Sequence, residues 1–153
     1  MPQSLFGQKE YIVQKEEIEQ RVELARKAHA QGYNCAESVV LAYADCVGLD
    51  KTVAEKMSVS FGGGVAKMRE ICGCVSAMAM LAGFIKENQD ENSRPDTEKC
   101  YQWTKCLADK FRSECGDIVC KRLRGIEKGC TKPPMPCREL VATMARLIGE
   151  SLA

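Results

Sequence analysis

The residues best suited to chemistry in this chain are its ten cysteines, in a sequence of 153 residues with one histidine. A thiolate binds metals and attacks disulfides. No two cysteines are separated by two residues, which excludes the C-x-x-C motifs of thioredoxins, zinc ribbons, c-type haem sites and bacterial ferredoxins. The single histidine, His29, excludes two-histidine zinc sites, and we expect it to be exposed or to cap a helix C-terminus. The cysteines are Cys35, Cys46, Cys72, Cys74, Cys100, Cys106, Cys115, Cys120, Cys130 and Cys137.

Several of these cysteines fall at or near the N-termini of predicted helices, namely Cys35, Cys72 or Cys74, Cys120 and Cys137. Backbone N–H groups and the helix dipole stabilise negative charge at such positions, so thiolates are favoured there. Three others are expected inside helices as buried packing residues, a common role for free cysteine: Cys46, Cys100 and Cys106.

The helices that position these cysteines follow from apolar spacing, capping residues and glycine or proline breaks. The first is a long amphipathic helix that includes Ile12 and stops at Gly32, and Asn34 and Asp50 are good N-caps for the next two. The later helices are expected over residues 35–47, 51–60, 71–85, 96–114, 118–124 and 137–152. No segment alternates like a strand, and no repeat or composition shift marks a second domain. The sequence therefore predicts one all-α domain over residues 1–153, a bundle of about six or seven helices.

The last predicted helix has an apolar face that could pack in the core or join two chains as a homodimer. Its members are Leu140, Met144, Leu147 and Ile148.

Composition and charge argue against a protein that binds nucleic acid or membranes. With 22 basic and 21 acidic residues the net charge is +1, which gives no general attraction to nucleic acid or to anionic membranes, and no nucleic-acid partner is expected. The first twenty residues do not have the pattern expected of a secretory signal, and the longest apolar stretch, 71–85, is shorter than the roughly 20 residues that cross a bilayer. We therefore expect a cytoplasmic protein without membrane insertion. Many cysteines in that reducing compartment indicate metal binding or redox chemistry.

A triple glycine, Gly62-Gly63-Gly64, must break any regular element. It is not a phosphate loop, because the G-x-x-x-x-G-K-[ST] motif is absent and no strand precedes it. Since a Rossmann fingerprint is missing as well, no nucleotide or flavin cofactor is expected. We expect this backbone to pass close to the helix at Cys72, or to a cofactor there, where a Cβ would collide. Its amides could then donate hydrogen bonds to the sulfurs of a bound cluster.

A basic run lies beside Cys120: Lys121, Arg122, Arg124 and Lys128. Such a run is usually a solvated face. It could also favour a thiolate nearby or dock an acidic electron-transfer partner.

Taken in order, several motifs resemble one family: Gly32-Tyr33-Asn34-Cys35-Ala36-Glu37-Ser38, Phe61-Gly62-Gly63-Gly64, Cys72-Gly73-Cys74-Val75-Ser76-Ala77, then Cys120 and Cys137. From about Ala28 to Ala153 the chain resembles the C_GCAxxG_C_C family of redox-active proteins. The resemblance implies an all-helical fold with four recurrent cysteines, here Cys35, Cys72, Cys120 and Cys137. A similar domain in the split-Soret cytochromes is associated with an iron–sulfur centre. The resemblance therefore implies an iron–sulfur cluster on these four cysteines, with Gly62, Gly63, Gly64 and Gly73 around it.

The chain departs from the family motif at two places, where Cys74 replaces alanine and Ala77 replaces glycine. The extra thiol leaves open whether Cys74 takes the place of Cys72. Three functions also stay open. The chain could be an electron carrier with an iron–sulfur cluster and a redox partner protein, a metal-free thiol/disulfide redox protein, or a protein held together by a structural Cys₄ zinc site.

Overall fold

The computed structural model describes residues 14–130 and 133–153. These residues form seven α-helices and no β-strand, which confirms the predicted all-α fold. The helices are α2 (Lys15–Ala30), α3 (Cys35–Tyr43), α4 (Lys51–Ser58), α5 (Gly73–Leu81), α6 (Thr97–Cys115), α7 (Cys120–Leu123) and α8 (Cys137–Leu152). Short 3₁₀ turns occupy Val59–Phe61, Ala82–Phe84 and Lys86–Asn88. The expected start of the first helix around Ile12 lies outside the described residues.

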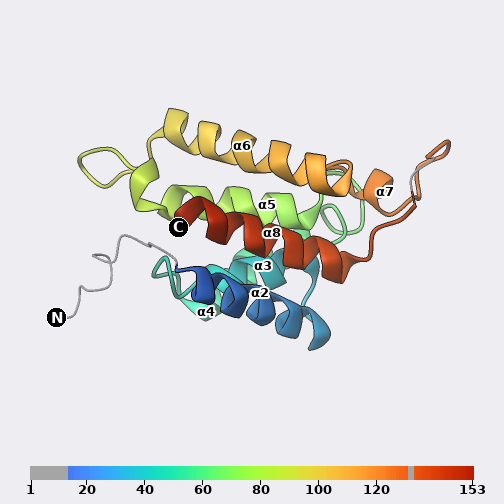
Figure 1. Ribbon diagram of the computed structural model, residues 1–153, viewed down its shortest axis with the longest axis horizontal. Coiled ribbons are helices and arrows are strands. Elements are labelled where there is room, and N and C mark those ends of the chain that lie inside the picture. Colours follow the sequence, from blue (N-terminus) through green and yellow to red (C-terminus); the bar gives the residue numbers. More distant parts are fainter. Residues whose placement is uncertain (1–13, 131–132) are drawn as a thin grey trace.

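The helices α3, α5 and α8 form the middle of the bundle. One side is covered by α2, which packs on α8 and α3, and the other by α6, which packs on α8 and α5 (Figure 1). The apolar face of α8 belongs to this core, since its four predicted members are at most 2% exposed. That face is therefore used within the chain. The largest buried side chains include Tyr43, Met78, Leu81, Phe111, Met144 and Ile148.

Side chains at the helix starts explain why several helices begin where the sequence predicts. Asn34 and Glu37 form a reciprocal capping box, in which each side chain accepts a hydrogen bond from the other's backbone amide at 2.9 Å. Asp50 and Asp96 cap α4 and α6, each by accepting a single backbone hydrogen bond. Gly116 then ends α6 in the left-handed conformation typical of a C-cap.

The expected central helix over 71–85 is shorter than predicted. It begins at Gly73, ends at Leu81 and continues as a 3₁₀ turn. Its start is displaced because Ile71 pairs with Val119 in an isolated antiparallel bridge, which holds the backbone extended. Within the described residues, no helix combines the length and apolar character needed to span a bilayer.

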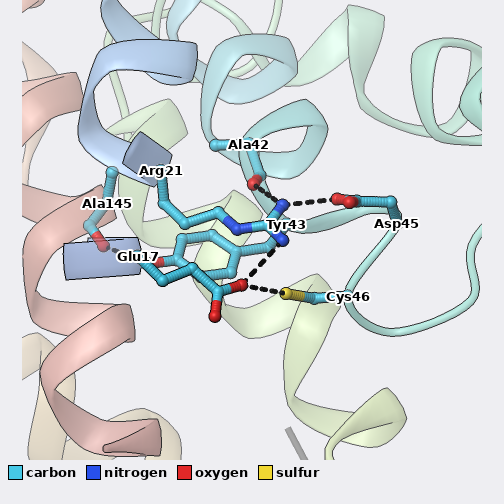
Figure 2. Close-up of polar contacts among 7 residues, drawn as sticks. All are labelled: Glu17, Arg21, Ala42, Tyr43, Asp45, Cys46 and Ala145. Carbon is cyan, nitrogen blue, oxygen red and sulfur yellow. Dashed lines mark hydrogen bonds and ion pairs between the residues drawn. The ribbon is translucent and has the colours of Figure 1, made fainter. Parts of the chain in front are cut away.

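A half-buried arginine joins α2 to α3 (Figure 2). Arg21 forms ion pairs with Glu17 at 3.0 Å and with Asp45 at 2.5 Å, and its guanidinium lies 5.8 Å from the centre of the Tyr43 ring. Burial lowers the pKa of Arg21, but the bonds to Asp45 and Glu17 outweigh it and raise the pKa overall. The Tyr43 hydroxyl donates to the Ala145 carbonyl at 2.7 Å, which ties the same cluster to α8.

Candidate functional site: a cavity lined by four cysteines

One cavity of about 350 Å³ is lined by Cys35, Cys72, Cys120 and Cys137. Each stands at a helix start: Cys72 is the N-cap of α5, and the other three are the first residues of α3, α7 and α8. The starts of these helices gather at the end of the bundle where α7 lies, on the right in Figure 1. The backbone N–H groups at a helix start can stabilise an anionic sulfur, and burial and neighbouring charges add to or oppose this effect at each cysteine.

Backbone pairing explains how Cys72 and Cys120 come together although they are far apart in the chain. The Cys72 amide donates to the Ile118 carbonyl at 2.8 Å, and the Cys120 amide donates to the Glu70 carbonyl at 2.6 Å. These bonds flank the bridge between 71 and 119. They place each cysteine at the end of one of two short, paired, extended backbone segments, where its helix begins.

The sulfur of Cys35 is surrounded by several hydrogen-bond donors. The Cys74 thiol donates a hydrogen bond to it, and the backbone amides of Gly63, Ala36 and Cys35 itself also donate. Burial opposes ionisation, but the hydrogen bonds from these donors outweigh it and lower the pKa of Cys35 to about 6. The amide of Gly63, in the triple glycine, thus donates to a cysteine sulfur.

Cys74 lies behind the cavity wall rather than on it. Its side chain is fully buried and hydrogen-bonds with the sulfurs of both Cys35 and Cys72. These two bonds, followed by burial, raise the pKa of Cys74 well above that of a free thiol, so it stays protonated and acts as the donor. In this arrangement Cys72 lines the cavity and Cys74 supports it.

The other two cysteines each face an arginine. Arg69 directs a guanidinium nitrogen at the Cys120 sulfur at 3.8 Å, and Arg124 does the same to the Cys137 sulfur at 3.3 Å. Burial raises the pKa of Cys137, and the positive charge of Arg124 opposes that rise. Negative charge on the neighbouring cavity cysteines raises this pKa further.

Two glycines leave room for the sulfurs. A Cβ on Gly73 would lie 2.5 Å from the Cys35 sulfur, and one on Gly64 would lie 2.7 Å from the Cβ of Cys120. Gly62 and Gly63 line the cavity, and a Cβ on Gly62 would strike the Asn34 side chain at 2.4 Å. The close approaches of the triple glycine are thus to Asn34 and Cys120, whereas the sequence predicted one to the helix at Cys72. Gly73, at the start of that helix, makes a separate close approach to Cys35.

A left-handed turn over residues 63–67 forms part of the cavity wall. All five residues have φ between 49° and 69°, including Val65, Ala66 and Lys67, which carry side chains. The left-handed conformation costs a residue with a Cβ about 1–2 kcal/mol, most for a β-branched one. The turn is held by backbone bonds such as that from the Ala66 amide to the Ser60 carbonyl at 2.8 Å. Strain of this kind persists where surrounding structure demands it, commonly at functional sites.

Sequence reasoning missed several residues of the cavity. His29, the second-last residue of α2, is half-buried and lines it, whereas an exposed or capping role was expected. Asn34 also lines it, while serving as the N-cap of α3. Of the predicted basic run only Arg124 lines the cavity, and Lys67 and Arg69 join it from the turn region. The sequence does hold a signal for His29. It lies near the end of the first predicted helix, only six residues before Cys35 at the start of the next, so the short connection keeps the two residues close.

The remaining cysteines lie elsewhere. Cys100 is half-buried on α6, but Cys106 is exposed on the same helix, so the prediction that Cys106 is a buried packing residue is wrong. Cys46 follows α3 in a turn, half-buried, with its sulfur 4.0 Å from Glu17. Cys115 and Cys130 line a separate cavity of about 220 Å³, and burial raises the pKa of Cys115 to about 11.

The four cavity cysteines are thiols and not disulfides in this structure. Among the described residues, no three side chains of histidine, cysteine, aspartate or glutamate are grouped tightly enough to hold a single metal ion. The cysteines thus surround a common space without converging on one point.

Comparison with protein-family models matches residues 33–151 to a family described as "Putative redox-active protein (C_GCAxxG_C_C)". The match begins just before the capping box of α3 and ends in the last turn of α8, so it contains all four cavity cysteines. Searches of curated proteins and of solved structures found no significant match.

Proposed function

Because this chain belongs to the C_GCAxxG_C_C family of redox-active proteins, we propose that it is an electron carrier that binds an iron–sulfur cluster. Its ligands are Cys35, Cys72, Cys120 and Cys137. The observation that carries the proposal is that these four cysteines, from four separate helix starts, line one cavity. Thiolates are the usual protein ligands of such clusters.

The donor set and its surroundings suit a cluster better than a single zinc ion. A structural zinc site needs four sulfurs around one point at about 2.3 Å, and no such grouping is found among the described residues. A cluster contains several iron and sulfide atoms, so its ligands lie farther apart and surround a volume. A cavity lined by four cysteines at its walls has this character.

The charges at the cavity also fit an anionic group. Lys67, Arg69 and Arg124 line it together with the four thiols. They offset part of the negative charge that four thiolates would concentrate there. The Gly63 amide and the Cys74 thiol add hydrogen bonds to sulfur.

When bound, an iron–sulfur cluster supplies one-electron transfer, at a potential set by charge, burial and hydrogen bonds to its sulfurs. This chain's residues set those conditions. The Cys74 thiol donates to the sulfur of one proposed ligand, Cys35, and Arg69 and Arg124 place positive charge against Cys120 and Cys137. Each of these contacts favours the more negative, reduced state of the site.

Anaerobic purification and reconstitution with iron and sulfide test this function. We expect visible colour, iron together with acid-labile sulfide, and a spectrum that bleaches on reduction. Cys120→Ser should abolish all three, whereas Cys106→Ser, at an exposed position outside the cavity, should preserve them. Zinc without iron would indicate a structural Cys₄ site, and a stable protein with neither metal would contradict the proposal.

One specific observation favours a second candidate, a metal-free thiol/disulfide redox protein. Cys35 is held as a thiolate by the thiol of Cys74 next to it. In this function the Cys35 thiolate attacks a disulfide of the substrate, forming a mixed disulfide and releasing one substrate thiolate. Cys74 then loses its proton and attacks the Cys35 sulfur, which forms an intramolecular disulfide and releases the second substrate thiol.

This second function predicts a result different from metal binding. Incubation of metal-free protein with oxidised glutathione should yield a Cys35–Cys74 disulfide, found by peptide mass mapping, with two glutathione thiols released per disulfide. Cys35→Ser should stop the reaction, and Cys74→Ser should trap the mixed disulfide.

A further inference from the structure

The region beside the cysteine cavity carries most of the large exposed apolar side chains of the described chain. Of nine such side chains, five fall between residues 57 and 71, and a sixth is Ile126. Val59 lines the cavity itself, and Met68, next to the left-handed turn, is 60% exposed. Exposed apolar side chains concentrated beside a functional cavity indicate a contact surface rather than chance exposure.

The same region is strongly basic although the chain as a whole is nearly neutral. Segments 56–71 and 120–130 contain seven basic and two acidic residues, against a net charge of +1 for the whole sequence. The two segments are joined side by side, since the Lys121 amide donates to the Arg69 carbonyl at 3.2 Å. One of the two acidic residues, Glu127, is already paired with Arg122 at 3.0 Å. The rest of the chain is correspondingly acidic.

From this combination we infer that segments 56–71 and 120–130, together termed the basic rim, dock a redox partner protein with an acidic surface. The inference rests on the proposed redox function. The rim pairs apolar side chains with positive charge at the opening of the cavity, as in an interface with an apolar centre and a charged edge. Complementary charge guides the partner to segments that themselves line the cysteine cavity, so an electron would have a short path to the cysteines.

The residues outside the basic rim are acidic on balance, which disfavours nucleic acid and anionic membrane as partners. A nucleic acid or an anionic membrane presents negative charge over a surface wider than the rim and would also face the acidic remainder. A protein with a compact carboxylate patch matches the rim and avoids the rest. We therefore assign the rim to an acidic protein. Binding of nucleic acid or of an anionic membrane is tested as an alternative outcome.

The test uses a small acidic ferredoxin as probe, with binding followed by isothermal titration calorimetry at low and high salt. Wild-type protein should bind the ferredoxin and lose affinity as salt increases. Lys67→Glu combined with Lys121→Glu should weaken binding about tenfold or more at low salt. The matched control reverses two exposed lysines on α6, Lys105→Glu with Lys110→Glu, and should stay within about twofold of wild type.

A second matched pair tests the apolar part of the rim. Met68→Ser removes an exposed apolar side chain from it, and Leu24→Ser removes one of similar exposure from α2. We expect a loss of about threefold to tenfold in affinity for the first and no loss for the second.

Several outcomes would overturn the docking surface. These are no binding of the ferredoxin, affinity that does not change with salt, equal effects of the rim and α6 variants, or tighter binding of a basic cytochrome, a DNA duplex or phosphatidylserine vesicles. Iron content is measured on the same samples. Because binding requires no electron transfer, ferredoxin binding without iron would contradict the cluster alone, and iron without ferredoxin binding would contradict the docking surface alone.

Discussion

Gly73 and the sulfur of Cys35 are in direct apposition, since a Cβ at residue 73 would lie 2.5 Å from that sulfur. The same Cβ would lie 2.9 Å from the Phe61 carbonyl oxygen. The start of α5 thus packs against both the start of α3 and the end of the 3₁₀ turn at 59–61. A residue larger than glycine must push one of the three away, and the sulfur is the part of greatest functional importance.

Gly73→Ala should therefore move the Cys35 sulfur and lower iron loading severalfold, at a cost of about 1–3 kcal/mol in the free energy of unfolding. Iron analysis after reconstitution and urea denaturation measure the two effects. Gly83→Ala is the control, because its Cβ would meet only Pro95 at ordinary contact distance, 3.6 Å. Equal iron loading in the two variants would show that the close approach has no role in the site.

The ionisation of Cys35 should depend on Cys74. In metal-free protein, ultraviolet absorbance of the thiolate should show a Cys35 transition near a pKa of about 6, because the Cys74 thiol donates to this sulfur. Cys74→Ala removes the donor and should move the transition to higher pH, whereas Cys74→Ser keeps a donor and should largely preserve it. Cys35→Ser identifies the transition by removing it.

The same shift makes stability depend on pH. The pKa of Cys35 is lower in the folded chain, about 6, than the ordinary thiol value of 9.0. A group of this kind adds stability that is fully present above the ordinary thiol pKa and is lost as the pH falls from there through the folded value. Metal-free wild type should therefore lose more stability over this interval than Cys35→Ser, as measured by urea denaturation. Parallel curves for the two would contradict the ionised state of Cys35.

The half-buried Arg21 of α2 should contribute to stability and not to the cavity. Arg21→Ala removes the cation from the partly exposed Glu17 and the exposed Asp45 and removes a bond to the Ala42 carbonyl, so we expect a loss of about 1–2 kcal/mol. Arg26→Ala breaks an exposed pair with Glu23 and should cost at most about 0.5 kcal/mol. Urea denaturation measures both. Iron loading of folded Arg21→Ala should match wild type.

The left-handed turn predicts a substitution to glycine that stabilises the protein. Val65→Gly should raise the free energy of unfolding by roughly 0.5–1 kcal/mol, because valine is strained at φ 66° and glycine is not. Val53→Gly, at an exposed position inside α4, should lower it by about 1 kcal/mol. Thermal denaturation compares the two. A loss of stability in both would mean that the turn stores no strain.

Local physical chemistry made much of this fold predictable. Helix starts at Cys35, Lys51 and Thr97 depend on caps one residue away, Asn34, Asp50 and Asp96, which the sequence displays directly. The all-α class follows from apolar spacing in the same way. These features depend on neighbours within one helical turn, so no knowledge of packing is needed to find them. The placement of the cavity cysteines at helix starts belongs to this class.

The sequence alone could not predict which side chains from distant parts of the chain lie close together. Cys72 and Cys120 lie near each other because backbone hydrogen bonds join two segments that are nearly fifty residues apart in the chain. The late start of α5 follows from the same backbone bonds. Arg69 and His29 join the cavity for the same reason, since each reaches it through packing between elements. The left-handed turn at 63–67 is imposed by contacts that outweigh the preference of its own residues. Motifs therefore named the four cysteines, and the tertiary structure decided what surrounds them, because charge and hydrogen bonding at a site are set by neighbours in space.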